Sequence, residues 1–396
     1  MKTRYWLPIA VLFIAAAGIY WFCMIPATVH PAGAQSQARF QPGPYAVITE
    51  TLDLLDTARD TPRNRDLPGH PGRELKGTLW RPDGLQQAGP LVVHSHGFTS
   101  THIEALYLAR FLASHGYTVA AVDYPLTSYG TPGEPLVTDV VNQPGDVSFL
   151  IDTLLQRSAS EGDTLFASID PRRIALSGIS LGGLTTTLAT FHPRMRDPRI
   201  RAAISIAGPS SMLLPGFFAG EDTPYLAIYG DHDVVVPYPA NGAPLPEKNP
   251  DTVLVTLLGG SHAGFLQLGA TMMRFMGNPD TLGCHFVLAG LENGEAAEDQ
   301  QFVGILGNAS EGIDDGAEVD ICSTPPPPVT MASARQHMFT ILAAYSFLES
   351  VFDTSGESRR SARDYLVQTL AGENTGEVTV AAPAATQGMA AALSGR

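Results

Sequence analysis

A serine that could attack a carbonyl carbon lies in the pattern Gly-x-Ser-x-Gly at residues 178–182. An apolar run, 174–176, precedes the pattern, and a helix-length segment, 181–192, follows it. Such a serine needs small neighbours, because the chain makes a tight, strained turn between strand and helix where other backbone passes close. The amino terminus of the following helix would direct its partial positive charge at the hydroxyl. This placement predicts that Ser180 is a nucleophile in covalent catalysis.

A serine hydroxyl needs a base to remove its proton, and the base needs an acid to orient it. Two further apolar runs, 224–230 and 252–258, are each followed by a polar turn. Asp233 follows the first run, and His262 follows the second. Because open α/β sheets carry their sites at the carboxyl ends of the strands, the sequence predicts that Asp233 and His262 complete a triad with Ser180.

Other candidates for the acid and the base fit less well. Asp231 directly follows Gly230, where a carboxylate commonly bonds backbone N–H groups and shapes the turn. Two histidines follow His262 in the chain: His285 lies among acidic residues, and His337 lies within an expected helix. None of these alternatives is expected to take part in the proton transfer.

The oxyanion that forms on a substrate needs N–H donors. One donor is expected from the backbone of Leu181, directly after the nucleophile, and a second from Phe98 in the His-Gly-Phe turn at 96–98. His94 and His96 would share one face of a strand, as metal ligands can, but no third ligand is evident. Structural hydrogen bonding by these histidines is therefore favoured, and neither a metal nor a cofactor is expected.

The segments around these residues alternate between short apolar runs and helix-length stretches. The expected fold class is therefore α/β, with a mostly parallel central sheet and helices on both faces. The expected strands cover 46–56, 74–80, 90–97, 117–124, 172–178, 201–208, 224–230 and 252–260, and the expected helices cover 103–116, 146–157, 181–192 and 334–352. A short cap, 208–223, has five apolar side chains that either line an acyl site or pack in the core: Met212, Leu213, Leu214, Phe217 and Phe218.

Residues 45–354 form the expected catalytic domain, and further segments flank it. Residues 1–25 contain Lys and Arg followed by a mainly apolar run, which at about 1.5 Å per residue could span a hydrocarbon core of ~30 Å. This run is either an uncleaved membrane anchor or a cleaved signal segment with an Ala-x-Ala site at 32–34. Residues 26–44 are expected to be a linker, and residues 355–396 a flexible tail.

An acidic insertion, residues 277–328, interrupts the alternation before the expected last helix. It contains ten of the 39 acidic residues of the chain and no Lys or Arg. A solvated acidic loop is the favoured interpretation, and a calcium site is a weaker one because the spacing of the acids matches no calcium loop. Cys284 and Cys322 lie near the ends of the insertion. Since export permits disulfides, the sequence predicts a Cys284–Cys322 bridge beside the mouth of the site.

The composition excludes several classes of protein. The 396 residues include 24 basic and 39 acidic side chains, a net charge of −15. No nucleic-acid partner is expected, because phosphate contacts need a surface rich in Lys and Arg. A hydrophobic content of 44% excludes a disordered chain, and three cysteines exclude a disulfide-dense scaffold.

The blocks VVHSHGFTS, GDVSFLIDTLL, IDPRRIALSGISLGG and GDHDVVVP resemble those of the α/β-hydrolase family. Together with DTARDTPRNRDL and GTLWRP, they look most like its dienelactone-hydrolase-like and platelet-activating-factor-acetylhydrolase-like branch. The resemblance implies an α/β-hydrolase fold and a serine esterase without a cofactor, in which Ser180, Asp233 and His262 are nucleophile, acid and base. Dienelactone hydrolases carry Cys at the nucleophile, so Ser180 argues against a dienelactone substrate.

The leading hypothesis is an exported carboxylic-ester hydrolase that acts on small-molecule or lipid-like esters through a Ser-His-Asp triad and an acyl-enzyme. A catalytically silent binding domain is one alternative, although no triad residue is missing. An amidase or peptidase is another, although the short cap leaves no room for a large lid. Residues 1–25 would anchor the protein to a membrane if uncleaved, and cleavage would leave it periplasmic or secreted. The sequence indicates no oligomeric state.

Overall fold

The computed structural model describes residues 18, 25–292, 302–317 and 320–383. The strands in these ranges are β1 (Val47–Asp56), β2 (Arg73–Pro82), β3 (Gly89–Ser95), β4 (Thr118–Asp123), β5 (Ile169–Ile179), β6 (Ile200–Ile206), β7 (Tyr225–Gly230), β8 (Thr252–Leu257) and β9 (Val378–Ala381). The longer helices are α3 (Leu106–Ser114), α4 (Gln143–Ala159), α5 (Leu181–Phe191), α9 (Asp280–Glu292), α12 (Ser333–Phe352) and α13 (Gly356–Asp364). The shorter helical segments are α2 (Ala34–Arg39), η1 (Val137–Asn142), α6 (Pro215–Phe218), α7 (Leu245–Lys248), η2 (Ala263–Phe265), α8 (Gln267–Ala270), α11 (Phe302–Leu306), η3 (Ala309–Glu311), η4 (Tyr365–Thr369) and α14 (Leu370–Glu373).

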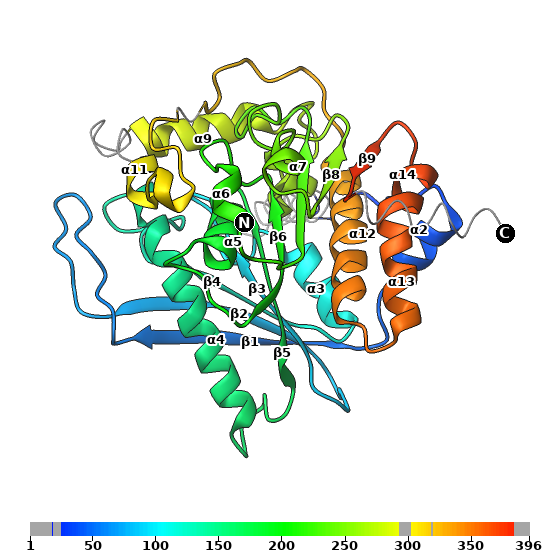
Figure 1. Cartoon of the computed structure of the whole chain (residues 1–396), viewed down its shortest axis with the longest axis horizontal. Coiled ribbons are helices and arrows are strands. Elements are labelled where there is room, and N and C mark those ends of the chain that lie inside the picture. Colours follow the sequence, from blue (N-terminus) through cyan, green and yellow to red (C-terminus); the bar gives the residue numbers. More distant parts are fainter. Residues whose placement is uncertain (1–17, 19–24, 293–301, 318–319, 384–396) are drawn as a thin grey trace, which may run out of the picture.

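The strands form one sheet in the order β1-β2-β4-β3-β5-β6-β7-β8-β9 (Figure 1). Neighbours from β4 to β8 in this order pair in parallel, whereas β1–β2, β2–β4 and β8–β9 are antiparallel pairs. Every residue of β3 and of β7 is buried, as expected for parallel strands covered on both faces. The predicted fold class, α/β with a mostly parallel sheet, is confirmed.

Helices cover the two faces of the sheet because each presents an apolar stripe to it. On one face, α3 and α12 contribute Leu112 and Leu342 to a core with Val92 and Ile204 of the central strands. On the other face, α4 packs on the strands through Leu150 and its neighbours, and α5 lies beside it. The carboxyl ends of the parallel strands therefore remain available for a site between these layers.

The carboxyl-terminal segment corrects one prediction. Instead of a flexible tail from residue 355, α13, α14 and β9 continue the fold, so α12 is not the last helix. Tyr365, Leu366 and Leu370 are buried in the core beside α12, at helical spacing. The Ala, Gly, Thr and Ser content of the segment concealed this apolar face from a prediction based on composition. Strand β9 pairs with β8 and so covers an edge of the sheet that would otherwise be open.

The segment before the domain also differs from the linker predicted at 26–44. Part of it forms α2, which lies next to α14 and α13 in Figure 1. Ser36 is buried there: its Oγ lies 2.7 Å from the Tyr365 hydroxyl oxygen, and its N–H donates to Glu373. Apart from residues 18 and 25, the predicted apolar span of residues 1–25 lies outside the described residues. Within the described ranges, no helix is both long enough and apolar enough to cross a membrane.

The acidic insertion is folded rather than a solvated loop. Its described part contains α9, α11 and η3. Cys284, Phe302 and Ile313 are buried in the same apolar cluster as Leu181 of α5. The apolar residues scattered between the acidic ones therefore give the insertion a core-facing side. The predicted Cys284–Cys322 disulfide is present and is thereby confirmed.

The short cap at 208–223 packs in the core, which was one of the two alternatives for its apolar side chains. Met212, Leu213, Phe217 and Phe218 are buried in the cluster that contains the insertion's apolar residues. The Met212 carbonyl accepts a hydrogen bond of 2.9 Å from the Asp314 N–H, so cap and insertion are joined along their backbones.

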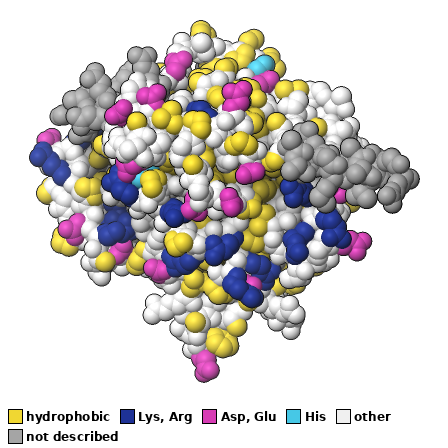
Figure 2. All heavy atoms as spheres, in the orientation of Figure 1, with side chains coloured by type: hydrophobic (Ala, Val, Ile, Leu, Met, Phe, Trp, Pro, Cys, Tyr) yellow, Lys and Arg dark blue, Asp and Glu magenta, His cyan; other side chains and the backbone are white. Residues whose placement is uncertain are grey.

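Charged side chains are mixed on the surface. On the face shown in Figure 2, the Lys and Arg side chains gather across the middle and lower part and stand among Asp and Glu side chains. Several basic residues of the described surface are paired, for example Arg157 with Asp163 at 3.0 Å and Arg173 with Asp170 at 3.0 Å.

Candidate active site

Ser180 occupies the sharp turn that the sequence predicts between a strand and a helix. Strand β5 ends at Ile179, and α5 begins at Leu181. Ser180 has φ 57° and ψ −123°, a conformation that costs a non-glycine residue energy and that recurs at functional sites. Its N–H donates to the Ile206 carbonyl at 2.8 Å, which fixes the turn to the next strand. Ser180 is half-buried, whereas the residues on either side of it are buried.

The glycines of the turn are required by close backbone contacts. A Cβ atom on Gly178 would lie 2.1 Å from the Gly182 carbonyl oxygen. A Cβ atom on Gly182 would lie 1.9 Å from the Ser95 carbonyl oxygen at the end of β3. Both distances are far below van der Waals contact. The Gly-x-Ser-x-Gly pattern is therefore a packing requirement of this turn.

Asp233 and His262 meet at the same edge of the sheet, after β7 and β8. The Asp233 Oδ2 atom lies 2.7 Å from His262 Nδ1. The other oxygen, Oδ1, accepts the N–H groups of Val235 and Val236 at 2.9 and 2.7 Å. Asp233 and His262 are 4% and 5% exposed, so their hydrogen bond is shielded from water. The carboxylate holds the imidazole with Nδ1 protonated, which leaves Nε2 as the basic nitrogen.

The electrostatic surroundings favour the charged form of His262. Burial by itself would lower the pKa of its imidazole. The charge of Asp233 and its hydrogen bond outweigh burial, and the charges of Asp280 and Glu104 act in the same direction. The pKa of His262 is therefore raised above its ordinary value, and the imidazolium that a base forms during catalysis is stabilised.

The alternative acid and base candidates have other contacts. Asp231 accepts the N–H of Gly259 at 2.6 Å, which joins the turns after β7 and β8. His337 stacks on Tyr107 with ring centroids 3.7 Å apart, and its Nε2 lies 3.0 Å from the Leu266 carbonyl oxygen. Burial lowers the pKa of His337 to about 3, so this histidine stays neutral.

The Glu104 carboxylate lies near Ser180 and the turn after β3. A Cβ atom on Gly97 would be 3.1 Å from Ser180 Cβ and 3.5 Å from Glu104 Oε2, so these groups surround the same point. Both carboxylate oxygens of Glu104 accept the Gly97 N–H at 3.0 Å. Glu104 is 5% exposed and contributes to the raised pKa of His262. It therefore connects the turn after β3 to the histidine side of the site.

The turn after β3 carries Phe98, whose N–H is one of the two predicted oxyanion donors. The N–H groups on both sides of Phe98 are engaged: that of Gly97 by Glu104, and that of Thr99 by the Thr127 carbonyl at 2.9 Å. Phe98 lies between these anchors. The other predicted donor, Leu181, is the first residue of α5, where a backbone N–H has no intrahelical acceptor.

The two histidines of β3 and its turn make structural hydrogen bonds. His94 Nδ1 lies 2.9 Å from Ser177 Oγ. His96 Nε2 accepts the Tyr124 N–H at 3.0 Å, and its Nδ1 donates to the Gly97 carbonyl at 2.7 Å. Burial lowers the pKa of His96, which agrees with a neutral ring that both donates and accepts. No group of three or more His, Cys, Asp or Glu residues suited to a metal ion occurs among the described residues.

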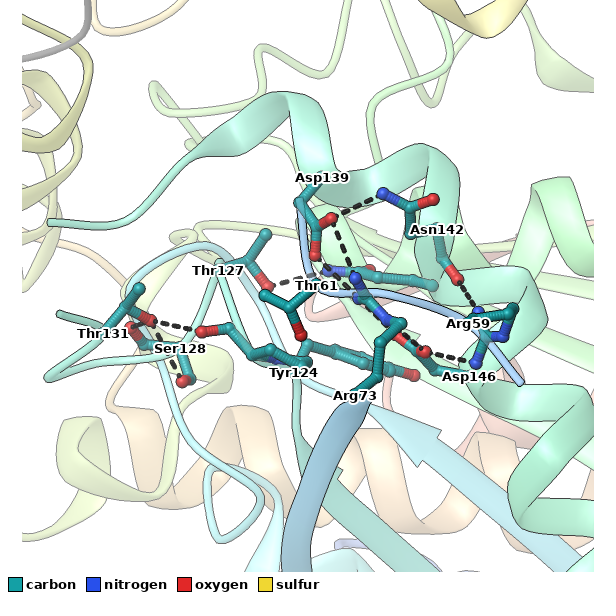
Figure 3. A network of polar contacts seen from close by, with 12 residues as sticks. Arg59, Thr61, Arg73, Tyr124, Thr127, Ser128, Thr131, Asp139, Asn142 and Asp146 are labelled. Carbon is teal, nitrogen blue, oxygen red and sulfur yellow. Dashed lines mark hydrogen bonds and ion pairs between the residues drawn. The ribbon is translucent and has the colours of Figure 1, made fainter. Parts of the chain in front are cut away.

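The turn after β3 that carries Phe98, here called the oxyanion turn, is held by the loop of Thr127, and a buried ion network lies beside this loop (Figure 3). Arg73 of β2 reaches Asp146 of α4 through Nε and Nη2, both at 2.7 Å, and Asp139 through Nη2 at 2.8 Å. Arg59 adds a bond of 2.6 Å to Asp146. Thr127, whose carbonyl holds the oxyanion turn, lies beside this network in the figure. Gln143, at the start of the helix that carries Asp146, donates to the Thr127 hydroxyl at 2.8 Å and so joins this helix to the loop of Thr127.

The helix α9 passes over the site. It begins at Asp280, which accepts the backbone N–H of His262 at 3.0 Å. A Cβ atom on Gly283 would lie 3.3 Å from the Ala263 side chain, and one on Gly290 would lie 3.0 Å from the Phe98 ring. The acidic insertion therefore reaches from the histidine turn to the oxyanion turn, in agreement with its predicted place beside the mouth of the site.

A groove of about 590 Å³ is lined by residues from 61–76 and 123–132, and Ser180, Asp233, His262 and Phe98 are not among them. Its wall includes Asp123, Ser128 and the exposed Tyr129. The Tyr129 N–H donates to the Ser100 carbonyl at 2.8 Å, so the groove wall and the turn that carries Phe98 are continuous.

Two buried carboxylates of the site were missed from the sequence. Asp280 was counted only as one of the ten acids of the insertion, although Asn278-Pro-Asp is a typical helix start and the Asn278 side chain does accept the Asp280 N–H at 2.8 Å. Glu104 lies in a segment that was expected to be simply helical. No sequence signal connects either residue with His262 or with Gly97, because these contacts arise between different loops.

No protein-family model matches the chain. Cutinase 1 of Thermobifida cellulosilytica and a cutinase of Thermobifida fusca (strain YX) are each 24% identical over 211 residues, 53% of this chain. The mostly parallel sheet with helices on both faces is that of the α/β-hydrolase fold. The chain has this fold. Its alignment spans 68% and 59% of the lengths of the two cutinases.

Two further similarities are partial. Hydrolase LUC6 of Fusarium sp is 30% identical over 151 residues, which make up 37% of this chain and 33% of LUC6. The solved structure of a ferulic acid esterase from Streptomyces cinnamoneus aligns with 84% of this chain and 93% of its own chain, at 21% identity and a TM-score of 0.48. The finer resemblance to the dienelactone-hydrolase-like branch stays a prediction.

Proposed function

We propose that this protein cleaves carboxylic esters with Ser180 as nucleophile, His262 as general base and Asp233 as the acid that orients the base. The observation that carries the proposal is the buried 2.7 Å contact between Asp233 Oδ2 and His262 Nδ1. It lies at the sheet edge on which the strained turn of Ser180 opens. The relationship to two cutinases supports a carboxylic-ester hydrolase over a silent binding domain.

The reaction follows from these positions. The Ser180 Oγ attacks the ester carbonyl carbon while His262 Nε2 takes its proton, and Asp233 stabilises the resulting imidazolium. The backbone N–H groups of Leu181 and Phe98 bind the oxyanion. The tetrahedral intermediate collapses, His262 returns the proton to the leaving alkoxide, and the alcohol departs from an acyl-enzyme. Water, deprotonated by His262, then attacks the acyl carbon and restores Ser180 with release of the acid.

A small-molecule or lipid-like ester is the proposed substrate, and the groove lined by 61–76 and 123–132 is a candidate site for the part of it that lies away from Ser180. Its volume of about 590 Å³ falls within the range of small-molecule sites, and it adjoins the turn of Phe98 through Ser100. One part of the ester would extend along Tyr129 and Ser128. The relationship to two cutinases favours an ester over an amide or peptide substrate.

Export of the enzyme is part of the proposal. The basic and apolar amino-terminal sequence and the Cys284–Cys322 disulfide both fit an extracytoplasmic location. Amino-terminal sequencing of the protein from its native host distinguishes the two forms. A start near Gln35 indicates a cleaved signal, and an intact amino terminus in the membrane pellet indicates an anchor. Recovery of an intact chain in the cytoplasm would contradict export.

Covalent labelling tests the proposed nucleophile. A fluorophosphonate ester should label Ser180 of the wild type, and Ser180→Ala should lose both labelling and hydrolysis of p-nitrophenyl esters. The control is Ser211→Ala, which removes the hydroxyl of a half-buried serine in the cap and should leave both signals unchanged. Persistent labelling or turnover in Ser180→Ala would disprove the assignment. Esters of increasing acyl length, together with matching anilides, would define the substrate class.

A further inference from the structure

The carboxylate of Asp280 connects the two loops that carry the acid and the base. Its side chain is fully buried at the first residue of α9. Oδ1 accepts the Ala263 N–H at 2.7 Å, and Oδ2 accepts the His262 N–H at 3.0 Å. The same Oδ2 accepts the N–H of Val234, next to Asp233, at 3.4 Å. One carboxylate therefore binds backbone N–H groups of both loops.

The insertion secures this carboxylate by a second route. The Val234 carbonyl accepts the Cys322 N–H at 2.8 Å, so Val234 is held by the insertion through both its N–H and its carbonyl. Cys322 is also linked to Cys284, one turn after Asp280 in α9. The disulfide thus links α9, which carries Asp280, to the segment at Cys322 that binds the Val234 carbonyl.

We propose that Asp280 is a positioning residue of the catalytic pair, whose carboxylate fastens the His262 loop to the Asp233 loop. The proposal rests on the proposed function for its effect on turnover, but its structural content does not depend on the substrate. It also gives the acidic insertion a role: one of its ten acids organises the site, and the disulfide keeps that acid in place.

The charges around Asp280 have a defined balance. Burial and the charge of Asp233 raise the pKa of Asp280, whereas His262 and the N–H groups that Asp280 accepts lower it, and the net result is a pKa of about 6. The ionised carboxylate in turn raises the pKa of His262, together with Asp233 and Glu104. These four groups come from the turns after β3, β7 and β8 and from α9. Near neutral pH, an ionised Asp280 therefore stabilises the imidazolium.

Asparagine cannot replace the carboxylate. Both oxygens of Asp280 accept backbone N–H groups, so an amide would turn its NH₂ group toward either the Ala263 N–H or the His262 N–H. Two donors would then face each other, and the negative charge would be lost as well. Glutamate keeps the charge, but its extra methylene displaces the two oxygens from these donors. The two substitutions therefore separate charge from position.

The test compares Asp280→Asn and Asp280→Glu with Asp315→Asn, which removes the same charge from an exposed position of the same insertion. Asp280→Asn should lower kcat by about 100-fold with little change in KM, as a displaced catalytic group does. The acid limb of its kcat/KM profile should move to lower pH, because His262 loses a stabilising charge. Asp315→Asn should match the wild type in both measurements.

NMR titration of the His262 ring makes the proposal independent of substrate. The pKa of His262 should fall in Asp280→Asn and stay near the wild-type value in Asp280→Glu, whose kcat should nevertheless fall. If the wild type hydrolyses no ester, the proposed function fails, and the His262 titration still decides the role of Asp280. An unchanged His262 pKa in Asp280→Asn would overturn the proposal. Should that variant not fold, wild-type kcat in Asp280→Glu would overturn it.

Discussion

Removing the Arg73 guanidinium should destabilise the protein strongly, because this group neutralises two buried carboxylates. Arg73 is 1% exposed, and the side chains of Asp139 and Asp146 are fully buried. In Arg73→Met, Asp146 keeps its bond to Arg59, whereas Asp139 keeps only the neutral Asn142 amide, at 2.6 Å. Breaking a buried ion pair from one side costs about 3–5 kcal/mol. We therefore expect the free energy of unfolding at pH 7 to fall by about 4 kcal/mol.

The loss should depend on pH in a defined direction. Burial already holds the pKa of Asp146 above its ordinary value despite Arg73. Without the guanidinium, the folded variant favours the protonated Asp146 carboxyl group more than the unfolded chain does. Its stability relative to the wild type should therefore recover as the pH falls from 7 to 5. Urea unfolding followed by circular dichroism at both pH values measures this difference.

A matched control lies on the same strand. Lys76 of β2 also pairs with a carboxylate, Glu74, but the two side chains are 62% and 60% exposed. Exposed ion pairs contribute little to stability because water screens them, so Lys76→Met should leave the urea midpoint close to that of the wild type. Equal losses in Arg73→Met and Lys76→Met would refute the reasoning from burial. So would a loss in Arg73→Met that does not change between pH 7 and pH 5.

Two further predictions concern the disulfide and the orienting acid. Cys284 and Cys322 are 38 residues apart, so replacing both with Ala should reduce the free energy of unfolding by roughly 4 kcal/mol, because the unfolded chain regains loop entropy. Calorimetry should show a Tm lower by roughly 5 °C. An unchanged Tm would contradict this prediction. Asp233→Asn should lower kcat about 10⁴-fold because the imidazole loses its correct tautomer. Asp231→Asn, which loses its bond to the Gly259 N–H, should reduce stability more than kcat, and the reverse ranking would transfer the catalytic role to Asp231.

The sequence by itself determined the fold class and the candidates for nucleophile, orienting acid and base. Ser180, Asp233 and His262 each follow an apolar run that became a strand, and the carboxyl ends of parallel strands share one edge of a sheet. The local sequence pattern was therefore enough to predict the contact between Asp233 and His262 that the structure contains. The Cys284–Cys322 bridge was also predictable, because these cysteines were alone at the ends of one segment.

Composition misled where apolar residues were few but well placed. The tail from residue 355 is rich in small and polar residues, yet Tyr365 and Leu370 are buried and β9 extends the sheet. The acidic insertion is dominated in sequence by its charge, yet Phe302 and Ile313 hold it against α5 and the cap. In both segments a handful of buried side chains supplies the packing, and an average over the segment cannot reveal them.

Only the tertiary structure decided what surrounds the catalytic pair. Asp280 lies 18 residues from His262 in the chain and reaches its backbone N–H across a loop. Glu104 likewise accepts the Gly97 N–H of the oxyanion turn, and its charge helps to raise the pKa of His262. The sequence does not distinguish a carboxylate that is solvated from one that is buried against N–H donors. Burial, and with it the pKa and the role of the group, is set by the packing of distant loops, which no local pattern encodes.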